Sequence, residues 1–177
     1  MQWSSDLEVG LPAIDVQHWH LFVLIQQIVP TDARQEDRAA IRNIVIQLGR
    51  LARCHFDCEE WLMSTHNYPD SERHIIEHDK LAFEIERYQD GPIFPPRKLA
   101  AILNNWLVSH TLMDDRPLAL HLRTLTGSQE IPLAQSLSDA FFDIVVGPKC
   151  GEPCEGEPPA SFSRITAYHR FQWRRSC

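Results

Sequence analysis

A chain of 177 residues, of which 44% are hydrophobic, is long enough to form one domain with a buried core. Its formal net charge of −7 argues against non-specific binding to nucleic acid, which requires a basic surface. No apolar run reaches the roughly 20 residues that span a bilayer, and the N-terminus lacks the basic and apolar regions of a signal peptide. We therefore expect a soluble, cytoplasmic protein with no nucleic-acid or membrane partner.

The first 14 residues mix apolar and polar side chains and indicate an extended arm laid over the core. Asp15 is a good N-cap, and from residue 16 to about 29 apolar side chains recur at helical spacing. His18 lies on this apolar stripe, three residues before Leu21. The sequence therefore predicts a first helix with an inward-facing histidine.

A second helix is predicted from about residue 33 to 64, and its apolar stripe includes His55 and Glu59. Their four-residue spacing places both side chains on one helical face. A glutamate on an apolar stripe is unfavourable by several kcal/mol unless it is paired or bound to a cation, so Glu59 is a candidate ligand. Glu60 points about 100° away and is expected at the surface.

Residues 67–70 predict a turn, and the third helix after it carries His74 and His78, again four residues apart. The segment 90–96 contains one glycine and three prolines, which predicts a loop. A fourth helix from about residue 97 into the 120s carries His110. This pattern predicts an all-α fold, an antiparallel up-down-up-down four-helix bundle with an N-terminal arm, spanning residues 1–126.

The composition changes after this bundle and predicts a C-terminal extension. Residues 127–146 include apolar side chains that fit a short fifth helix. Residues 147–177 are rich in cysteine and proline, and we expect them to be loosely structured. A protein partner for this end of the chain is conceivable, and nothing in the sequence identifies it.

Four cysteines form two Cys-x3-Cys pairs: Cys54 with Cys58, and Cys150 with Cys154. Buried thiols of the core are the favoured interpretation of the first pair. The alternative is a zinc or redox site that combines all four thiols, although structural zinc pairs more often have shorter spacing.

Five histidines and two carboxylates are expected to face the interior of the bundle. They are His18, His55, Glu59, His74, His78 and His110, with an aspartate close after His110. This is far more imidazole than an acid–base site needs, and each helix contributes at least one such residue, which favours a metal. Imidazole suits zinc, copper, iron or nickel, and carboxylates that can bridge favour two ions over one tetrahedral zinc.

Four stretches of the chain resemble the hemerythrins, in particular the single-domain bacterial type. They are Ile14-Asp15-x-Gln17-His18-x-x-Leu21, His55-Phe56-x-x-Glu59-Glu60-x-Leu62-Met63, Tyr68-Pro69-x4-His74-x3-His78-x4-Phe83 and Trp106-Leu107-x-x-His110-x4-Asp115. They follow one another in the family's order and with family-like spacing, which makes the joint signal highly specific. The resemblance implies a non-haem centre of two iron ions that binds O2 reversibly.

The resemblance also implies how the ligands divide between the two irons. His74, His78 and His110 would hold one iron, and His18 and His55 would hold the other, which keeps an open position for O2. Glu59 and Asp115 would bridge the two irons.

Helical geometry and the family pattern favour different aspartates as the second bridging ligand. Regular helical geometry favours Asp114, four residues after His110, because a five-residue step turns about 140° beyond a full turn. The family pattern uses the five-residue step and therefore implies Asp115. Pro117 disfavours helical geometry at the residue before it, and a local break there could turn Asp115 inward.

The function that the resemblance implies is binding, in O2 storage, transport or sensing, and not catalysis. Trp106 and Leu112 match apolar positions of the family's O2 pocket, and ordinary bundle core explains them equally well. One alternative is a di-iron redox enzyme acting on peroxide or nitric oxide. Another is a signalling module that acts through the C-terminal extension. Ferritin-like di-iron enzymes use Glu-x-x-His pairs, which this chain lacks.

Overall fold

The computed structural model describes residues 3–29, 38–90 and 95–126, and every regular element in these ranges is helical. The elements are η1 (Ser5–Leu7), α1 (Pro12–Gln27), α2 (Arg38–Thr65), α3 (Ser71–Asp90), α4 (Pro96–His110), η2 (Thr111–Asp115) and α5 (Arg116–Thr126). The element η1 is a short 3-10 helix, and η2 is a π-helical turn. None of the helices in these ranges is long and apolar enough to cross a membrane.

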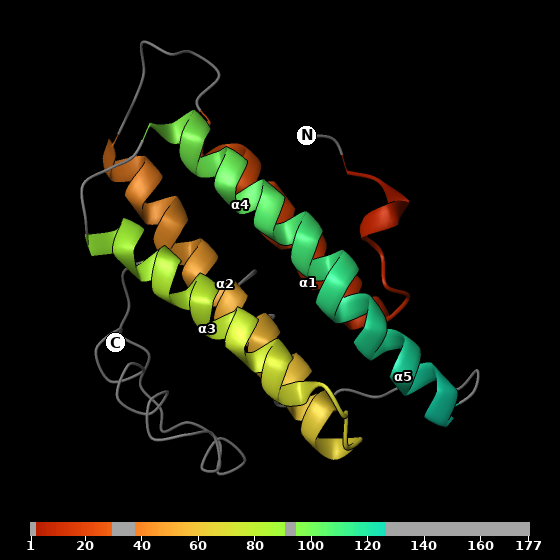
Figure 1. Cartoon of the computed structure of the whole chain (residues 1–177). Helices are drawn as coiled ribbons and strands as arrows, with labels where there is room; N and C mark the ends of the chain where they lie inside the picture. Colours follow the sequence, from red (N-terminus) through yellow and green to blue (C-terminus); the bar gives the residue numbers. More distant parts are fainter. Residues whose placement is uncertain (1–2, 30–37, 91–94, 127–177) are drawn as a thin grey trace, which may run out of the picture. The chain divides into compact units, whose positions relative to one another are not determined.

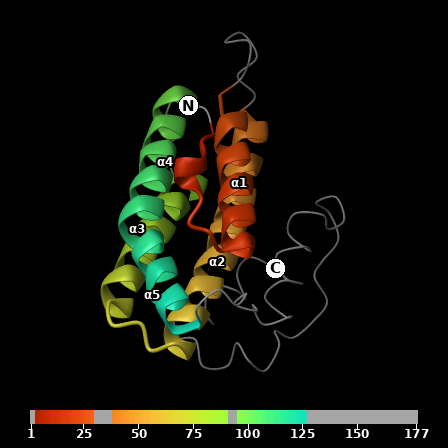
Figure 2. The same cartoon turned by 90° about the vertical axis from the view of Figure 1, so that its right-hand side faces the viewer.

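The long helices lie side by side as a bundle (Figure 1). Helix α2 packs against α1 and α3, and α4 packs against α1. Successive long helices run in opposite directions, as the order of colours along each of them shows. The elements α4, η2 and α5 follow one another without a gap and together form the fourth member of the bundle (Figure 2). The predicted all-α four-helix bundle is confirmed.

Apolar side chains at seven-residue intervals build the interior of the bundle. Leu21 on α1 and Ile28 directly after it are at most 1% exposed, and burying such a side chain contributes roughly 1.5–3 kcal/mol. On α2 the same interval connects Leu48, His55 and Leu62, all of them buried. A histidine therefore occupies a position that the apolar pattern would otherwise fill with a core residue.

The N-terminal arm joins α1 differently from the prediction. The helix begins at Pro12, and proline suits the first helical position because its missing N–H would have no partner there. The prediction of Asp15 as N-cap is therefore wrong, since Asp15 lies within the first turn. Its carboxylate instead accepts hydrogen bonds from the backbone N–H groups of Val9 (2.7 Å) and Gly10 (3.1 Å). Gly10 has φ of +78°, which glycine adopts readily, and this lets the arm turn back onto the helix.

Several predictions fall outside the described residues. They concern the first residues of the second helix, the short fifth helix within 127–146, and the segment 147–177 with Cys150 and Cys154. The proposed boundaries of these segments remain predictions. Within the described ranges, Cys54 and Cys58 are free and buried in α2.

Candidate metal centre

Seven ionisable side chains meet inside the bundle, and each is at most 2% exposed. They are His18 from α1, His55 and Glu59 from α2, His74 and His78 from α3, His110 from α4 and Asp115 from η2. All seven side chains predicted as ligands are thus brought to one place. Burying so many ionisable groups is costly unless they are paired with one another or bind cations.

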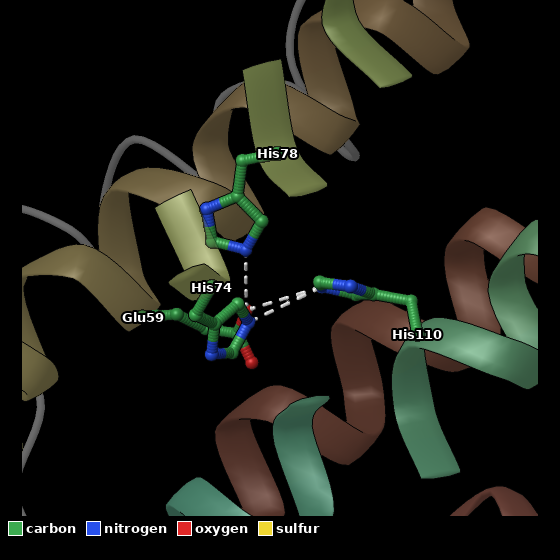
Figure 3. Close-up of side chains that lie close together, drawn as sticks. All are labelled: Glu59, His74, His78 and His110. Atoms are coloured by element: carbon green, nitrogen blue, oxygen red, sulfur yellow. Dashed lines mark hydrogen bonds and ion pairs between the residues drawn. The ribbon is translucent and has the colours of Figure 1, made fainter. Parts of the chain in front are cut away.

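Three imidazoles gather around Glu59 in the first of two groups (Figure 3). Their Nε2 atoms lie 3.1 Å (His78), 3.3 Å (His74) and 3.7 Å (His110) from Oε2 of Glu59. The ligand atoms of these four residues all lie within 4.8 Å of one another. Figure 3 shows the rings converging on the carboxylate from different helices. We call Glu59, His74, His78 and His110 the three-histidine group.

The second group consists of His18, His55, Glu59 and Asp115, whose ligand atoms also lie within 4.8 Å of one another. Nε2 of His55 is 3.6 Å from Oε2 of Glu59, and Nε2 of His18 is 3.1 Å from Oδ2 of Asp115. We call these four residues the two-histidine group. Because Glu59 belongs to both groups, the groups form one connected centre.

Asp115 also faces both groups. Its Oδ2 approaches His18, while its Oδ1 lies 3.0 Å from Nε2 of His110 and 3.2 Å from Nε2 of His74. The two oxygens of one carboxylate therefore point at different groups, which is the arrangement of a bridging ligand. With Glu59 shared in the same way, the centre offers two carboxylates between two sets of imidazoles.

The π-helical turn η2 explains why Asp115 can face the centre five residues after His110. The N–H of Arg116 donates to the C=O of Thr111, five residues earlier, so the turn is one residue wider than in an α-helix. The step from His110 to Asp115 then completes about one turn. The helix is continuous here, so a widened turn takes the place of the local break considered at Pro117.

Asp114 has a different role from Asp115. Its Oδ2 lies 3.3 Å from Nδ1 of His110, the nitrogen that faces away from the centre. Its Oδ1 pairs with the guanidinium of Arg73, which is 52% exposed. Asp114 therefore supports a ligand from behind and connects it to a surface charge.

Two further imidazoles also have a polar partner at Nδ1. Nδ1 of His55 lies 3.0 Å from Oε1 of Gln17, and Nδ1 of His78 lies 3.1 Å from Oε1 of Glu60. An acceptor at Nδ1 keeps the proton on that nitrogen and leaves the Nε2 lone pair free for a metal. The expectation that Glu60 lies at the surface is wrong, since it is only 16% exposed and reaches α3 from α2.

These supporting residues were not predicted from the sequence. The available signal was their position beside ligands in the motifs: Gln17 precedes His18, Glu60 follows Glu59, and Asp114 precedes Asp115.

The charges of the centre balance one another. Burial raises the pKa of Asp115, but the imidazoles of His110, His18 and His74 outweigh burial and hold that pKa well below its ordinary value. Burial and Asp115 raise the pKa of Glu59, and the surrounding histidines again prevail and hold it well below its usual range. Burial opposes a charge on His74, yet Asp115 and Glu59 raise its pKa to about 9. The imidazoles of His18, His55, His74 and His110 thus keep the two buried carboxylates ionised.

The pKa of His55 is lowered, whereas the pKa values of His18, His74 and His110 are raised. Burial lowers its pKa to about 3, against the opposing effect of Glu59. A neutral imidazole is the form that binds a metal.

The side chains alone do not satisfy the hydrogen-bonding capacity of the centre. Among the described residues, Nε2 of His18 and of His55 and both carboxylate oxygens of Asp115 are buried without a hydrogen bond. Oδ2 of Asp115 is nevertheless only 3.1 Å from Nε2 of His18. Atoms this close that do not hydrogen-bond are directed at a shared space, as ligands of a cation are. The residues present therefore fit a metal site with imidazole and carboxylate ligands.

Aromatic rings cover the three-histidine group. Phe56 stacks on His78 with ring centroids 4.1 Å apart, and Trp106 stacks on His110 with centroids 4.7 Å apart. Phe56 and Trp106 also meet edge to face, at 5.9 Å. These two rings shield one side of the centre from polar groups.

A small apolar cavity lies inside the bundle next to the centre. It is lined by Leu21, Ile25, Leu48, Ala52, Leu81, Ile85, Leu103 and Trp106. Its nearest lining residues are three or four positions from ligand histidines, so the cavity begins about one helical turn from the centre. Of the two residues predicted for an O2 pocket, Trp106 lines this cavity. Leu112 is half-buried and is not among the lining residues.

Comparison with known proteins places this centre in a family. No family model matches the chain. A bacteriohemerythrin from Pseudomonas aeruginosa is 30% identical over 118 residues, which cover 64% of this chain and 75% of the relative. Bacteriohemerythrins from Stenotrophomonas maltophilia and Clostridium acetobutylicum are 26% and 24% identical, over 78% and 95% of their own lengths.

An all-helical bundle whose four members each contribute buried imidazole or carboxylate ligands defines a helical-bundle metal-binding protein. The similarity to the bacteriohemerythrins, over three quarters of the relative from P. aeruginosa, specifies the class further. The chain belongs to the hemerythrin family. The resemblance seen in the sequence motifs is therefore confirmed.

Proposed function

We propose that the centre holds two non-haem iron ions and binds O2 reversibly at one of them. The observation that supports this most directly is the inequality of the two groups. If both carboxylates bridge, the three-histidine group supplies five protein ligands and the two-histidine group supplies four. The ion held by His18 and His55 would then have the more open coordination, which an incoming ligand needs.

The donor atoms argue against a structural zinc ion. A structural zinc ion prefers four ligands in a closed tetrahedron, commonly with thiolates, and here all seven ligands are imidazoles and carboxylates. Bridging carboxylates between two imidazole sets suit a pair of ions with five or six ligands each. Ferrous iron in such a centre supplies the electrons that O2 binding requires.

The protein's own residues would hold the ions, fix their orientation and exclude water. Gln17, Glu60 and Asp114 each hold the Nδ1 side of a ligand imidazole. Phe56, Trp106 and the apolar cavity keep one side of the centre dry. A dry pocket favours an apolar diatomic ligand and slows the entry of protons and anions that would displace it.

The site favours binding over turnover. Apart from the seven ligands, the buried side chains with polar or sulfur atoms among the described residues are Gln17, Cys54, Cys58, Tyr68, Tyr88, Thr111 and Asp114. Gln17 and Asp114 are already engaged with ligand histidines. The polar side chains that contact ligand imidazoles are therefore occupied, which supports binding over general acid–base catalysis.

The test is an absorption experiment on the full chain. Metal-free protein is loaded with ferrous iron without air, exposed to O2, and then returned to an O2-free atmosphere. We expect about two irons per chain and an O2-dependent absorption band that disappears and returns over repeated cycles. Iron well below two per chain would contradict the di-iron centre. Sustained consumption of peroxide or nitric oxide, with irreversible oxidation on first exposure to air, would favour the redox enzyme instead.

A further inference from the structure

A buried amide connects α1 to α2 behind the two-histidine group. The side chain of Gln17 is 1% exposed, and its Nε2 donates a hydrogen bond to Sγ of Cys58 at 3.3 Å. Its Oε1 lies 3.0 Å from Nδ1 of His55. Cys58 and His55 are both 0% exposed, so water has no access to either end of the amide.

The direction of this amide determines which nitrogen of His55 can bind a metal. With Oε1 facing the ring, Nδ1 keeps its proton and Nε2 presents a lone pair toward Glu59 and the centre. If the amide turned over, its N–H group would face Nδ1, and the proton would move to Nε2. An imidazole protonated on Nε2 cannot be a ligand through that atom.

Within the described part of the chain, the donor end of the amide hydrogen-bonds to the thiol of Cys58, whose sulfur accepts weakly but cannot be replaced by water in this buried position. In the observed direction the amide N–H faces this sulfur while the amide oxygen faces Nδ1 of His55, so both ends of the amide are engaged. Cys54 lies one helical turn before Cys58 and is also buried.

We propose that Cys58 is a positioning residue that acts through Gln17 on His55 and thereby sets the metal affinity of the two-histidine group. This rests on the proposed function, because it assigns a role to a residue behind one half of the di-iron centre. Without the thiol, the N–H end of the amide has no buried acceptor, and the amide loses its preference for the direction that leaves Nε2 of His55 free.

The test compares Cys58→Ala with Cys58→Ser and with Cys54→Ala. Serine keeps an acceptor for the amide, whereas alanine removes it. Cys54→Ala removes a similar buried volume one turn away and leaves the sulfur of Cys58 in place, so it is the matched control. Circular dichroism and thermal unfolding establish that each variant is folded.

The first readout is the tautomer of His55 in metal-free protein, from the nitrogen chemical shifts of the imidazole. We expect the Nδ1–H form in the natural protein, in Cys58→Ser and in Cys54→Ala. We expect a substantial share of the Nε2–H form in Cys58→Ala. This readout requires no iron, so it tests the inference even if the centre proves not to hold iron.

The second readout is titration with Co²⁺, which reports the binding of each ion by absorption. We expect Cys58→Ala to weaken one of two binding steps by roughly 10–100-fold, as loss of a ligand's supporting partner generally does, with recovery in Cys58→Ser. Gln17→Leu should reproduce the loss, and adding Cys58→Ala to it should cause little further change. The Gln17→Leu variant keeps the inference testable if Cys58→Ala fails to fold.

Two results would overturn the inference. One is a Cys58→Ala protein with the tautomer and both binding steps of the natural protein. The other is an equal loss in Cys58→Ala and Cys54→Ala, which would make the thiols mere core volume. If the natural protein binds fewer than two ions while the tautomers change as expected, the proposed function fails and the role of Cys58 stands.

Discussion

The two groups of the centre differ in what lies behind their imidazoles. In the three-histidine group, His78 and His110 each have a carboxylate at Nδ1, from Glu60 and Asp114. In the two-histidine group, His55 has only the neutral amide of Gln17. A carboxylate at Nδ1 makes the imidazole a stronger donor and ties it more firmly than an amide does. The ligand imidazoles of the three-histidine group are therefore held by more and stronger partners than His55, and we expect that group to bind an ion more tightly.

The largest effect is expected from replacing Glu59, the carboxylate that belongs to both groups. Glu59→Gln takes away a buried anion that faces four imidazoles, so neither group keeps its charge balance. We expect metal analysis after anaerobic loading to fall from about two irons per chain to nearly none. Glu72→Gln, at an exposed position of α3, is the control and should keep both irons. Two irons retained in Glu59→Gln would mean that the groups do not depend on a common bridge.

Replacing each of the two aspartates by alanine should have a smaller effect, and the effect should differ between them. Asp115→Ala removes a ligand that faces both groups, and we expect at most one iron per chain with loss of the O2-dependent absorption. Asp114→Ala removes only the partner of His110 at Nδ1, and we expect two irons with about tenfold weaker binding of one. The reverse pattern would assign the bridge to Asp114 and remove the significance of the π-helical turn.

The pH dependence of metal binding should follow from the raised pKa values of His74 and His110. Burial opposes the charge, but the carboxylates raise the pKa of His74 to about 9 and that of His110 well above its ordinary value. Metal-free protein therefore carries protons there at pH 7 that the metal must displace. We expect the apparent metal affinity to rise between pH 7 and 9, roughly tenfold per unit for each proton displaced. A metal affinity independent of pH over this range would contradict the protonation of His74 and His110 in the metal-free protein.

The same protons give the metal-free protein a pH-dependent stability. Folded His74 keeps its proton up to about pH 9, whereas an unfolded histidine releases it near 6.5. The folded state binds more protons in this window, so the free energy of unfolding should decrease as the pH rises from 6.5 to 9. Denaturant unfolding at several pH values measures the effect, and a His74→Gln variant, which lacks the contribution of His74, should show a smaller slope.

The smallest effect is expected from a substitution that makes the two groups more alike. Glu60→Gln keeps an acceptor at Nδ1 of His78 but removes its charge, so the support of His78 comes to resemble that of His55. Since Glu60 is partly exposed, we expect only about tenfold weaker binding by the three-histidine group, with the other binding step unchanged. Stepwise titration with Co²⁺ distinguishes the two steps. A loss in the other step would show that the groups are not supported independently.

The sequence was most informative where a charged or ligand-type residue occupies a position on the apolar stripe of a helix. Glu59 on an apolar stripe and histidines at four-residue intervals pointed to a buried centre, and the structure brings these side chains together. It was less informative where the outcome depends on a neighbouring helix. The outward direction assigned to Glu60 ignored that α3 lies beside that face of α2. A helical wheel describes one helix and cannot include the partner that a packed neighbour brings.

The position of Asp115 shows a second limit. The spacing of an ordinary helix favours Asp114, and only the family pattern favoured Asp115. The physical reason is the widened turn η2, whose hydrogen bond from Arg116 to Thr111 no periodicity of side chains reveals. The N-cap at Asp15 failed for a related reason, because Pro12 starts the helix earlier and the carboxylate serves the arm.

The widened turn has a consequence for the far end of the fourth helix. A π-helical turn is equivalent to one residue inserted into a regular helix, so every position after it is rotated relative to α4. The buried face of α5, which includes Leu118 and Leu122, is therefore in register only while the insertion is present. If the same residues instead formed a regular α-helix, Asp115 would turn about 100° away from the centre and the apolar face of α5 would rotate with it. The ligand geometry and the closure of that end of the bundle are thus encoded by the same extra residue.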